Sequence, residues 1–241
     1  MPHSVIEIGI IIPAFNPDPV LLSELIFRIF KILKGCSFQL LVIDDGSFPA
    51  VQLIEKFPEP VILRRSEKNG GKGLALKTGF NYFTRSRPAR YILTIDADLQ
   101  HPPEKIPEFL KQIRPNSRQI VVGHRERRLR QMPFHRILSN FLTSLIISSL
   151  TGRLIKDSQC GFRLFDPAIL TDLRLEENRF HLESELLIQA AWQKIHIGFV
   201  PIPTIYRQEK SSINNCRETL NFITMILRLV KRRIAEACMP F

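Results

Sequence analysis

Paired cysteines and an N-terminal signal segment are both lacking from this sequence. Only 4 of the 241 residues are cysteine, and no two of them form a Cys-x-x-Cys pair. This spacing argues against a zinc site and against a disulfide framework, and it favours reduced thiols in the cytosol. The first ten residues, MPHSVIEIGI, contain no basic segment that leads into an apolar stretch. We therefore expect no secretory signal and a cytoplasmic protein.

Long hydrophobic runs are lacking as well. No apolar run reaches the roughly 20 residues that a membrane-spanning helix needs. The longest candidate, FLTSLIISSL at residues 141–150, contains serine and threonine, and we expect it to be a buried helix. A second candidate, LNFITMILRLV at residues 220–230, is interrupted by Arg228. This second segment could lie on a membrane, but it could not cross one.

Acidic residues and the larger aromatic residues are few. The chain has 34 Lys and Arg against 23 Asp and Glu, a net charge of +11, with one Trp and 3 Tyr. Such an excess of positive charge suits a nucleic acid, a membrane surface or a phosphorylated substrate. The aromatic-rich basic surface of single-strand binders is not evident, and no zinc-finger or RRM motif is present. We expect no nucleic-acid partner and keep a nucleic-acid-binding protein only as a remote alternative.

The length and the hydrophobic pattern predict one α/β domain with a short appendage. Short runs rich in Val and Ile alternate with longer segments of helical period, a pattern typical of a mostly parallel sheet covered by helices. We expect strands at residues 6–12, 39–43, 61–64, 91–95, 120–122 and 198–201. We expect helices at residues 19–33, 73–83, 104–113, 134–150 and 183–193.

Two carboxylates follow the strand predicted at residues 91–95. Asp96 and Asp98 flank Ala97, and Gln100 adds a carbonyl oxygen two residues further on. Ligands of open α/β sheets bind beyond the carboxyl ends of the strands. Two carboxylates there can hold one hard divalent cation whose other ligands are substrate phosphates and water. We therefore favour a metal site at Asp96, Asp98 and Gln100 over a solvated turn.

A second acidic pair, Asp44 and Asp45, follows the strand at residues 39–43. Asp and Gly are turn formers, which gives this pair a purely structural interpretation. Carboxylates at the mouth of a sheet can equally accept hydrogen bonds from a nucleobase or a ribose. Both interpretations stay open.

Basic and glycine-rich loops provide candidate anion sites. Lys72 lies among glycines in NGGKG, directly before a predicted helix, and the free N–H groups of such a helix start favour phosphate. The spacing is not that of a Walker motif. A basic run begins at Arg125, with Arg136 just beyond it, and it is either a solvated loop or an arginine clamp for phosphate. Glu183 and Glu185 are either first-turn acids of a helix or a source of a general base.

In chain order, these motifs resemble glycosyltransferase family 2, and within it the polyprenyl-phosphate sugar synthases of the dolichol-phosphate mannosyltransferase type. The segments that carry the resemblance are IIPAFN, LVIDDGS, NGGKGLALKTGF, LTIDADLQHPPE, VVGHR, DSQCGFRLF, FHLESELLIQAAW and IGFVPIPTIYR. The resemblance implies a GT-A fold with a mostly parallel central sheet, a GDP- or UDP-sugar donor and Mg²⁺ or Mn²⁺. It divides the chain into a catalytic domain at residues 1–213 and a basic amphipathic helix at residues 214–241.

The resemblance also implies roles for individual residues. Those expected at the nucleotide-sugar site, with Lys72 added for phosphate, are Pro13, Phe15, Asn16, Asp44, Asp45, Lys72, Ala97 and Asp98. Those expected to serve catalysis or to meet the acceptor phosphate are Asp98, Arg125 and Arg136, with Arg163 and Arg207 as weaker candidates. Glu185 is added to the catalytic residues as a candidate general base, on the residue alone and not on the resemblance. The chain departs from the family in reading Asn16-Pro17 where Asn-Glu is frequent. The transmembrane tail that many relatives carry is not found in this sequence.

Together these features predict an inverting transfer of a sugar to a dolichyl or undecaprenyl phosphate at the cytosolic face of a membrane. A lipid phosphate is already anionic and needs no strong base, whereas a saccharide hydroxyl, the alternative acceptor, would need Glu183 or Glu185. At the C-terminus, Ile223, Leu227 and Ile234 follow a helical stripe. The surrounding cations are Arg228, Lys231, Arg232 and Arg233. This helix either packs on the domain or lies on an anionic membrane, and we expect peripheral association.

Overall fold

A seven-stranded sheet forms the centre of the molecule in the computed structural model. The structure describes residues 6–58, 61–114, 117–125, 134–205 and 215–238, and the statements below concern these residues. Along the sheet the strand order is β3-β2-β1-β4-β6-β5-β7. The strands are β1 (Ile6–Ala14), β2 (Phe38–Asp44), β3 (Ile62–Arg65), β4 (Ala89–Thr94), β5 (Gln119–Arg125), β6 (Arg163–Phe165) and β7 (His196–Ile202). All neighbours are parallel except β6, which is antiparallel to both β4 and β5.

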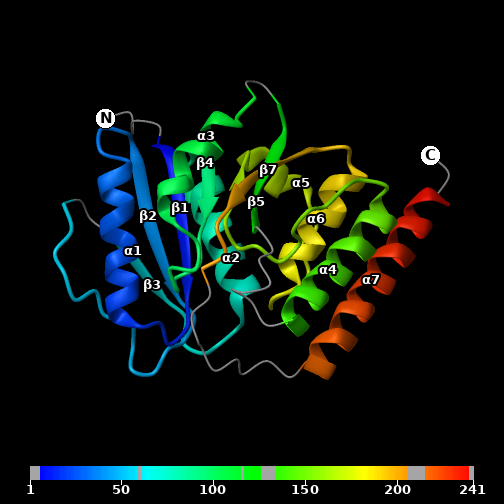
Figure 1. Cartoon of the computed structure of the whole chain (residues 1–241), viewed down its shortest axis with the longest axis horizontal. Coiled ribbons are helices and arrows are strands. Elements are labelled where there is room, and N and C mark those ends of the chain that lie inside the picture. The colour runs from blue at the N-terminus through cyan, green and yellow to red at the C-terminus, as the bar shows by residue number, and fades with distance from the viewer. Residues whose placement is uncertain (1–5, 59–60, 115–116, 126–133, 206–214, 239–241) are drawn as a thin grey trace.

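Helices cover the sheet and extend beyond one end of it (Figure 1). They are α1 (Pro19–Ile32), α2 (Lys72–Asn81), α3 (Ile106–Lys111), α4 (Phe134–Thr151), α5 (Pro167–Asp172), α6 (Leu182–Trp192) and α7 (Asn215–Ala237). A π-helical turn at Tyr82–Ser86 extends α2, and a 3₁₀ turn at Pro103–Lys105 precedes α3. Figure 1 shows α4 and α7 at the end of the molecule opposite to α1.

Local sequence explains the first β-α-β unit. The run from Ile8 to Ile12 is almost completely buried, as expected for a central strand with helices on both faces. Asp18 then caps α1 by accepting hydrogen bonds from the backbone N–H groups of Val20 and Leu21, and Pro19 opens the helix. All six predicted strands are confirmed. Strand β6 was missed because its 3 residues are too few for a hydrophobic period, and the 6-residue helix α5 was missed as well.

The helix predicted at residues 141–150 is confirmed, but the prediction that it is buried is wrong for its outer face. Five large apolar side chains on the outer face of α4 are between 43 and 49% exposed: Leu138, Phe141, Leu142, Leu145 and Ile146. The inner face combines the fully buried Ile147 with polar residues. Ser144 is buried and its hydroxyl lies 3.2 Å from that of Ser158. The apolar composition was read as burial of the whole segment, but in α4 only the side that carries Ser144 and Ile147 faces the protein.

Helix α7 carries two apolar stripes. Phe222, Met225 and Leu229 are buried against the domain, whereas Leu227 and Ile234 are exposed on another side of the helix. Within the described residues, no helix combines the length and the hydropathy that a membrane crossing needs.

Candidate active site

A largely buried lysine joins two carboxylates at the carboxyl edge of the sheet. Lys72, the first residue of α2, places its Nζ 2.7 Å from Oδ1 of Asp96 and 3.1 Å from Oε1 of Glu183. Asp96 follows β4, and Glu183 lies in the first turn of α6. Burial alone would lower the pKa of Lys72, but the two carboxylates outweigh it and the pKa is raised. The lysine is therefore a fixed positive charge in the site.

The carboxyl group of Asp96 rests directly on Gly161. A Cβ at position 161 would lie 2.6 Å from Cγ of Asp96, so only glycine leaves room for this arrangement. The hydroxyl of Thr94 donates a 2.8 Å hydrogen bond to the carbonyl of Gly161 and fixes the distance between the two segments. Burial raises the pKa of Asp96, but Lys72 and His101 outweigh it, so the pKa lies well below its ordinary value. Asp96 is thus ionised and held in one place.

His101 approaches the same carboxylate from another side. Its Nε2 lies 3.5 Å from Oδ2 of Asp96, and the ring is 4% exposed. Its Nδ1 is buried and meets no hydrogen-bond partner in the part of the chain that the structure describes. The ring lies at 27° to that of Phe162, with 6.0 Å between the centroids. His101 was not among the predicted site residues, although it stands in the quoted block LTIDADLQHPPE.

Asp98 lies in a tight turn after Asp96. Its Oδ1 accepts a hydrogen bond of 2.9 Å from the backbone N–H of Gln100, and Leu99 between them has a φ of 55°. Burial and the charge of Asp96 raise the pKa of Asp98. Two carboxylates that repel each other at a strand end favour a cation between or beside them.

The predicted metal ligands can be tested against this arrangement. No group of three His, Cys, Asp or Glu side chains is arranged to hold a metal ion within the described ranges. Mg²⁺ is usually bound through one or two carboxylates, with substrate phosphates and water completing its shell. Asp96 and Asp98 fit that mode. The backbone of Gln100 already closes the turn at Asp98, and a metal contact of its side chain stays a prediction.

The second acidic pair organises the neighbouring loops. Asp44 accepts hydrogen bonds from the backbone N–H groups of Ser47 and Val51, at 2.8 and 3.2 Å. Asp45 accepts bonds of 2.9 and 2.7 Å from the N–H groups of Gly70 and Gly71. Both residues therefore have a structural role: Asp44 closes a local turn, whereas Asp45 binds a loop 25 residues further along the chain. Asp45 also holds the glycine-rich loop that presents Lys72, and contact with a nucleotide remains a prediction.

The loop after β1 leaves one aromatic ring in solvent. The backbone N–H of Asn16 donates to Oγ of Ser47, and its Oδ1 accepts from the N–H of Phe48, both at 2.8 Å. The φ of Asn16 is 45°, a left-handed value that asparagine adopts more readily than most residues. Phe15 is 52% exposed, and Pro13 and Ala97 are half-buried. Phe15 is thus free to stack on a planar ligand.

The predicted phosphate-binding arginines have other partners in the described chain. Arg125 forms a bidentate pair with Asp157, with Nε–Oδ2 at 2.8 Å and Nη2–Oδ1 at 3.0 Å. Burial raises the pKa of Asp157, but Arg125 outweighs it and the pKa is lowered. Arg163 is 1% exposed and donates to the carbonyls of Ser158, Cys160 and Glu183. Arg163 therefore joins three backbone carbonyls, and its side chain is too deeply buried to contact an acceptor. The side chain of Arg136 and the whole of Arg207 lie outside the described residues.

Glu185 is also turned away from the site. Its Oε2 accepts hydrogen bonds from the backbone N–H groups of Glu176 and Glu177, and its Oε1 lies 3.3 Å from Arg228 of α7. Side chains two positions apart in an α-helix point about 200° apart around its axis. Glu183 therefore faces Lys72, whereas Glu185 faces α7. The expectation that Glu185 serves catalysis is not supported. Of the two alternatives that the sequence left open, Glu183 is the one in the site.

Several known proteins are similar to this chain in sequence. Residues 9–173 match the family model of glycosyl transferase family 2. The UDP-N-acetylglucosamine--dolichyl-phosphate N-acetylglucosaminyltransferase of Methanococcus voltae is 31% identical over 223 residues, which cover 83% of this chain and 86% of the relative. The dolichol-phosphate mannosyltransferase of Pyrococcus furiosus is 29% identical over 237 residues, which cover 93% of this chain and 64% of the relative.

A solved structure has the same fold. The glucosyl-3-phosphoglycerate synthase from Mycobacterium tuberculosis, in complex with Mn²⁺, UDP and glucosyl-3-phosphoglycerate, superposes with a TM-score of 0.68. The alignment covers 92% of this chain and 79% of the synthase at 16% identity, so the likeness concerns the fold alone. The fold is of the GT-A type, as the sequence motifs predicted.

Proposed function

Because the chain belongs to glycosyl transferase family 2, we propose that it transfers a sugar from a GDP- or UDP-sugar to a polyprenyl phosphate, with inversion at the sugar carbon. The names of the two relatives above, each of which includes a dolichyl phosphate or dolichol-phosphate acceptor, support the acceptor class. The donor would lie at the carboxyl edge of β1, β2 and β4, where the exposed ring of Phe15 is free to stack on the base. Lys72 would place its charge near the diphosphate.

Asp96 and Asp98 would hold Mg²⁺ or Mn²⁺ against the donor diphosphate. Such an ion supplies positive charge that stabilises the departing nucleoside diphosphate. Gly161, Thr94 and Lys72 fix Asp96 before the donor arrives, so little reorganisation is needed on binding. The protein therefore contributes a negative charge whose position is already fixed.

In the proposed reaction an oxygen of the acceptor phosphate forms a bond to C1 of the sugar. The bond from C1 to the diphosphate oxygen breaks, and the nucleoside diphosphate leaves with the electron pair. The attacking oxygen is already anionic, so no side chain has to remove a proton. This agrees with the state of the two glutamates, since Glu183 is paired with Lys72 and Glu185 is bound to backbone N–H groups.

The apolar outer face of α4 is the observation that carries the acceptor assignment. Folded soluble domains rarely expose a contiguous patch of five large apolar side chains without a binding role. The inner face of the same helix contacts Ser158, which adjoins Asp157 and precedes Gly161 by three residues. A lipid surface against α4 would therefore lie beside the donor site. We infer peripheral attachment at the cytosolic face of a membrane through α4 and α7.

A screen of nucleotide sugars tests the reaction. The full chain is incubated with GDP- and UDP-sugars and Mn²⁺, with and without a polyprenyl phosphate, and the labelled product is extracted into organic solvent. We expect extractable product only with the lipid phosphate and none in excess EDTA. Transfer only to water-soluble saccharides would refute the acceptor assignment, and full activity in EDTA would refute the role of the metal.

A pair of variants tests the membrane surface. Replacing Phe141 and Leu145 of α4 by serine should abolish sedimentation with lipid vesicles and reduce lipid-dependent transfer, with donor hydrolysis unchanged. Phe27→Ser on α1, where the side chain is 52% exposed, is the matched control and should behave as the wild type. Equal vesicle binding by all three proteins would exclude α4 from the membrane contact.

A further inference from the structure

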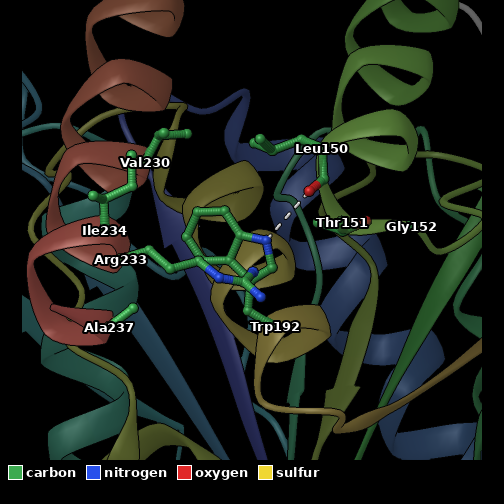
Figure 2. Close-up of a pocket in the computed structure, with 8 residues that line it drawn as sticks. All are labelled: Leu150, Thr151, Gly152, Trp192, Val230, Arg233, Ile234 and Ala237. Atoms are coloured by element: carbon green, nitrogen blue, oxygen red, sulfur yellow. Dashed lines mark hydrogen bonds between the residues drawn. The ribbon is translucent and has the colours of Figure 1, made fainter.

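A pocket of about 420 Å³ opens between the C-terminal ends of α4 and α7. Figure 2 shows the indole of Trp192, the last residue of α6, lying between the two helices. The apolar lining comes from Leu150 at one side and from Val230, Ile234 and Ala237 at the other. The pocket is continuous with an exposed stripe of α7, since Ile234 both lines it and is 58% exposed.

One cation lies at the rim of this pocket. The guanidinium carbon of Arg233 is 4.5 Å from the centroid of the Trp192 ring, and the indole N–H donates to the carbonyl of Leu150 at 3.4 Å. Arg228 and Arg232 are paired with glutamates of the domain. In the described portion of the molecule, Arg233 has no such carboxylate partner. The rim therefore carries a positive charge that an anionic ligand could neutralise.

A second pocket adjoins the first and is lined by charged side chains of both signs. It measures about 260 Å³, shares Trp192 and Arg233 with the first pocket, and also includes Arg174, Arg232, Asp172 and Glu236. Arg174 and Arg232 are paired with Glu176, so Arg233 is the arginine of this lining that an anionic group could neutralise. An apolar compartment beside this cation matches an amphiphile that has a hydrocarbon chain and an anionic head. Trp is enriched at the level of lipid headgroups for the same reason, since its ring is apolar and its N–H is polar.

We propose that this double pocket binds one anionic phospholipid of the bilayer, with an acyl chain between α4 and α7 and the phosphate at Arg233. The proposal rests on the membrane attachment inferred above. The ligand is an anchor and not the acceptor, because of its position. Near its start, α7 contacts the beginning of α6 through Glu218 and His181, 3.2 Å apart. Arg233 instead contacts Trp192 at the other end of α6, nine residues after Glu183 and about 14 Å from it along the helix axis. A phosphate at Arg233 is thus too distant to contact Lys72 or Asp96.

The single tryptophan of the chain makes the pocket directly observable. The full chain is titrated with phosphatidylglycerol vesicles whose acyl chains are brominated, and with the same vesicles without bromine. Bromine quenches indole emission only at contact distance. We expect more than half of the Trp192 emission to be lost with the brominated vesicles, and a blue shift without loss with the unlabelled vesicles. Brominated phosphatidylcholine vesicles should quench weakly.

Three variants separate the pocket from general membrane binding. Arg233→Gln should weaken binding to the anionic vesicles about fivefold, as expected for one cation near the surface, and should reduce quenching at saturation. Lys231→Gln removes an exposed cation two residues away and should weaken binding similarly but leave quenching at saturation unchanged. Ala237→Phe should fill the pocket, so that vesicles still bind but no longer quench.

The outcomes distinguish this proposal from the proposed function. Binding of wild-type protein to vesicles without quenching, or equal quenching by neutral and anionic vesicles, would overturn the phospholipid site and leave the transferase intact. Relief of quenching by a polyprenyl phosphate in neutral micelles would show that the pocket takes the acceptor chain. A blue shift that depends on protein concentration, without vesicles, would assign the pocket to a second copy. Either of these last two results would overturn the proposal.

Discussion

Replacing Gly161 by alanine should move Asp96 without changing its charge. The added Cβ would lie 2.6 Å from Cγ of Asp96, whereas nonbonded carbon atoms approach to about 3.5–4.0 Å. The carboxyl group and position 161 must therefore separate by about 1 Å. The backbone at this position cannot easily yield, because Thr94 holds the carbonyl of Gly161 and Arg163 holds those of Ser158 and Cys160. Asp96 is the group that moves.

The effect on catalysis can be bounded. A misplacement of about 1 Å at a catalytic group can cost about 100-fold in rate, so we expect Gly161→Ala to lose transfer by about two orders of magnitude. Its backbone is not in the left-handed region, so alanine adds no backbone strain, and the variant should fold. The assays are sugar transfer, calorimetric binding of the donor with Mn²⁺, and thermal unfolding.

Gly198→Ala is the matched control for this experiment. The nearest atom to a Cβ at position 198 is 3.7 Å away, which is an ordinary contact. This variant should transfer sugar at the wild-type rate. A folded Gly161→Ala protein with transfer and donor affinity within about twofold of wild type would refute the placement of Asp96 in the reaction, because the geometry there could then change freely. An equal loss in both variants would show that the effect is a general one on the sheet.

Three further outcomes are expected. Asp98→Asn keeps the shape of the side chain but removes its charge, so transfer should fall at least about 100-fold at unchanged stability, and undiminished Mn²⁺ binding by calorimetry would contradict this. Phe15→Ala should raise the KM for the donor about tenfold if the ring stacks on the base, with an unaltered melting temperature because the ring is half in solvent. Asp157→Asn leaves Arg125 buried without its partner and should lower the free energy of unfolding by about 3 kcal/mol at neutral pH. Since the pKa of Asp157 is lowered in the folded protein, its contribution is present above the ordinary value of about 3.9 and disappears as the pH falls below it. Urea unfolding at several pH values should therefore show wild type and Asp157→Asn converging in acid, and a constant difference would speak against the ion pair.

The sequence predicted most reliably the features that depend on a single strand and the residues directly after it. Continuous apolar runs such as the one in β1 predict buried parallel strands, and the residues directly after them lie at the ligand-binding edge by topology alone. Asp96 and Asp98 could be found in this way. Their place at the ligand-binding edge depends only on where β4 ends.

The partners of the charged side chains could not be predicted, because they come from distant parts of the chain. Asp45 meets the N–H groups of Gly70 and Gly71, and Arg125 meets Asp157, pairs that only the tertiary fold brings together. The choice between Glu183 and Glu185 depends on the rotation of one helix about its axis. Composition likewise could not show that α4 turns Ser144 and Ile147 inward and Leu142 and Leu145 outward.

The three-residue strand β6 has a consequence for the order in which the protein folds. In the described sheet it alone connects β4 to β5, so β5 and β7 join the first four strands only through Arg163–Phe165. During synthesis, the pairing partners among β3, β2, β1 and β4 are all present once residue 94 has been added. Strand β5 can join this part of the sheet only after α4 and β6 have followed it, and the entropy cost of closing that long loop precedes the contacts that offset it. The strands that lead to Asp96 are therefore complete in the growing chain before Gly161 and Glu183, which lie against Asp96 and Lys72, have been added.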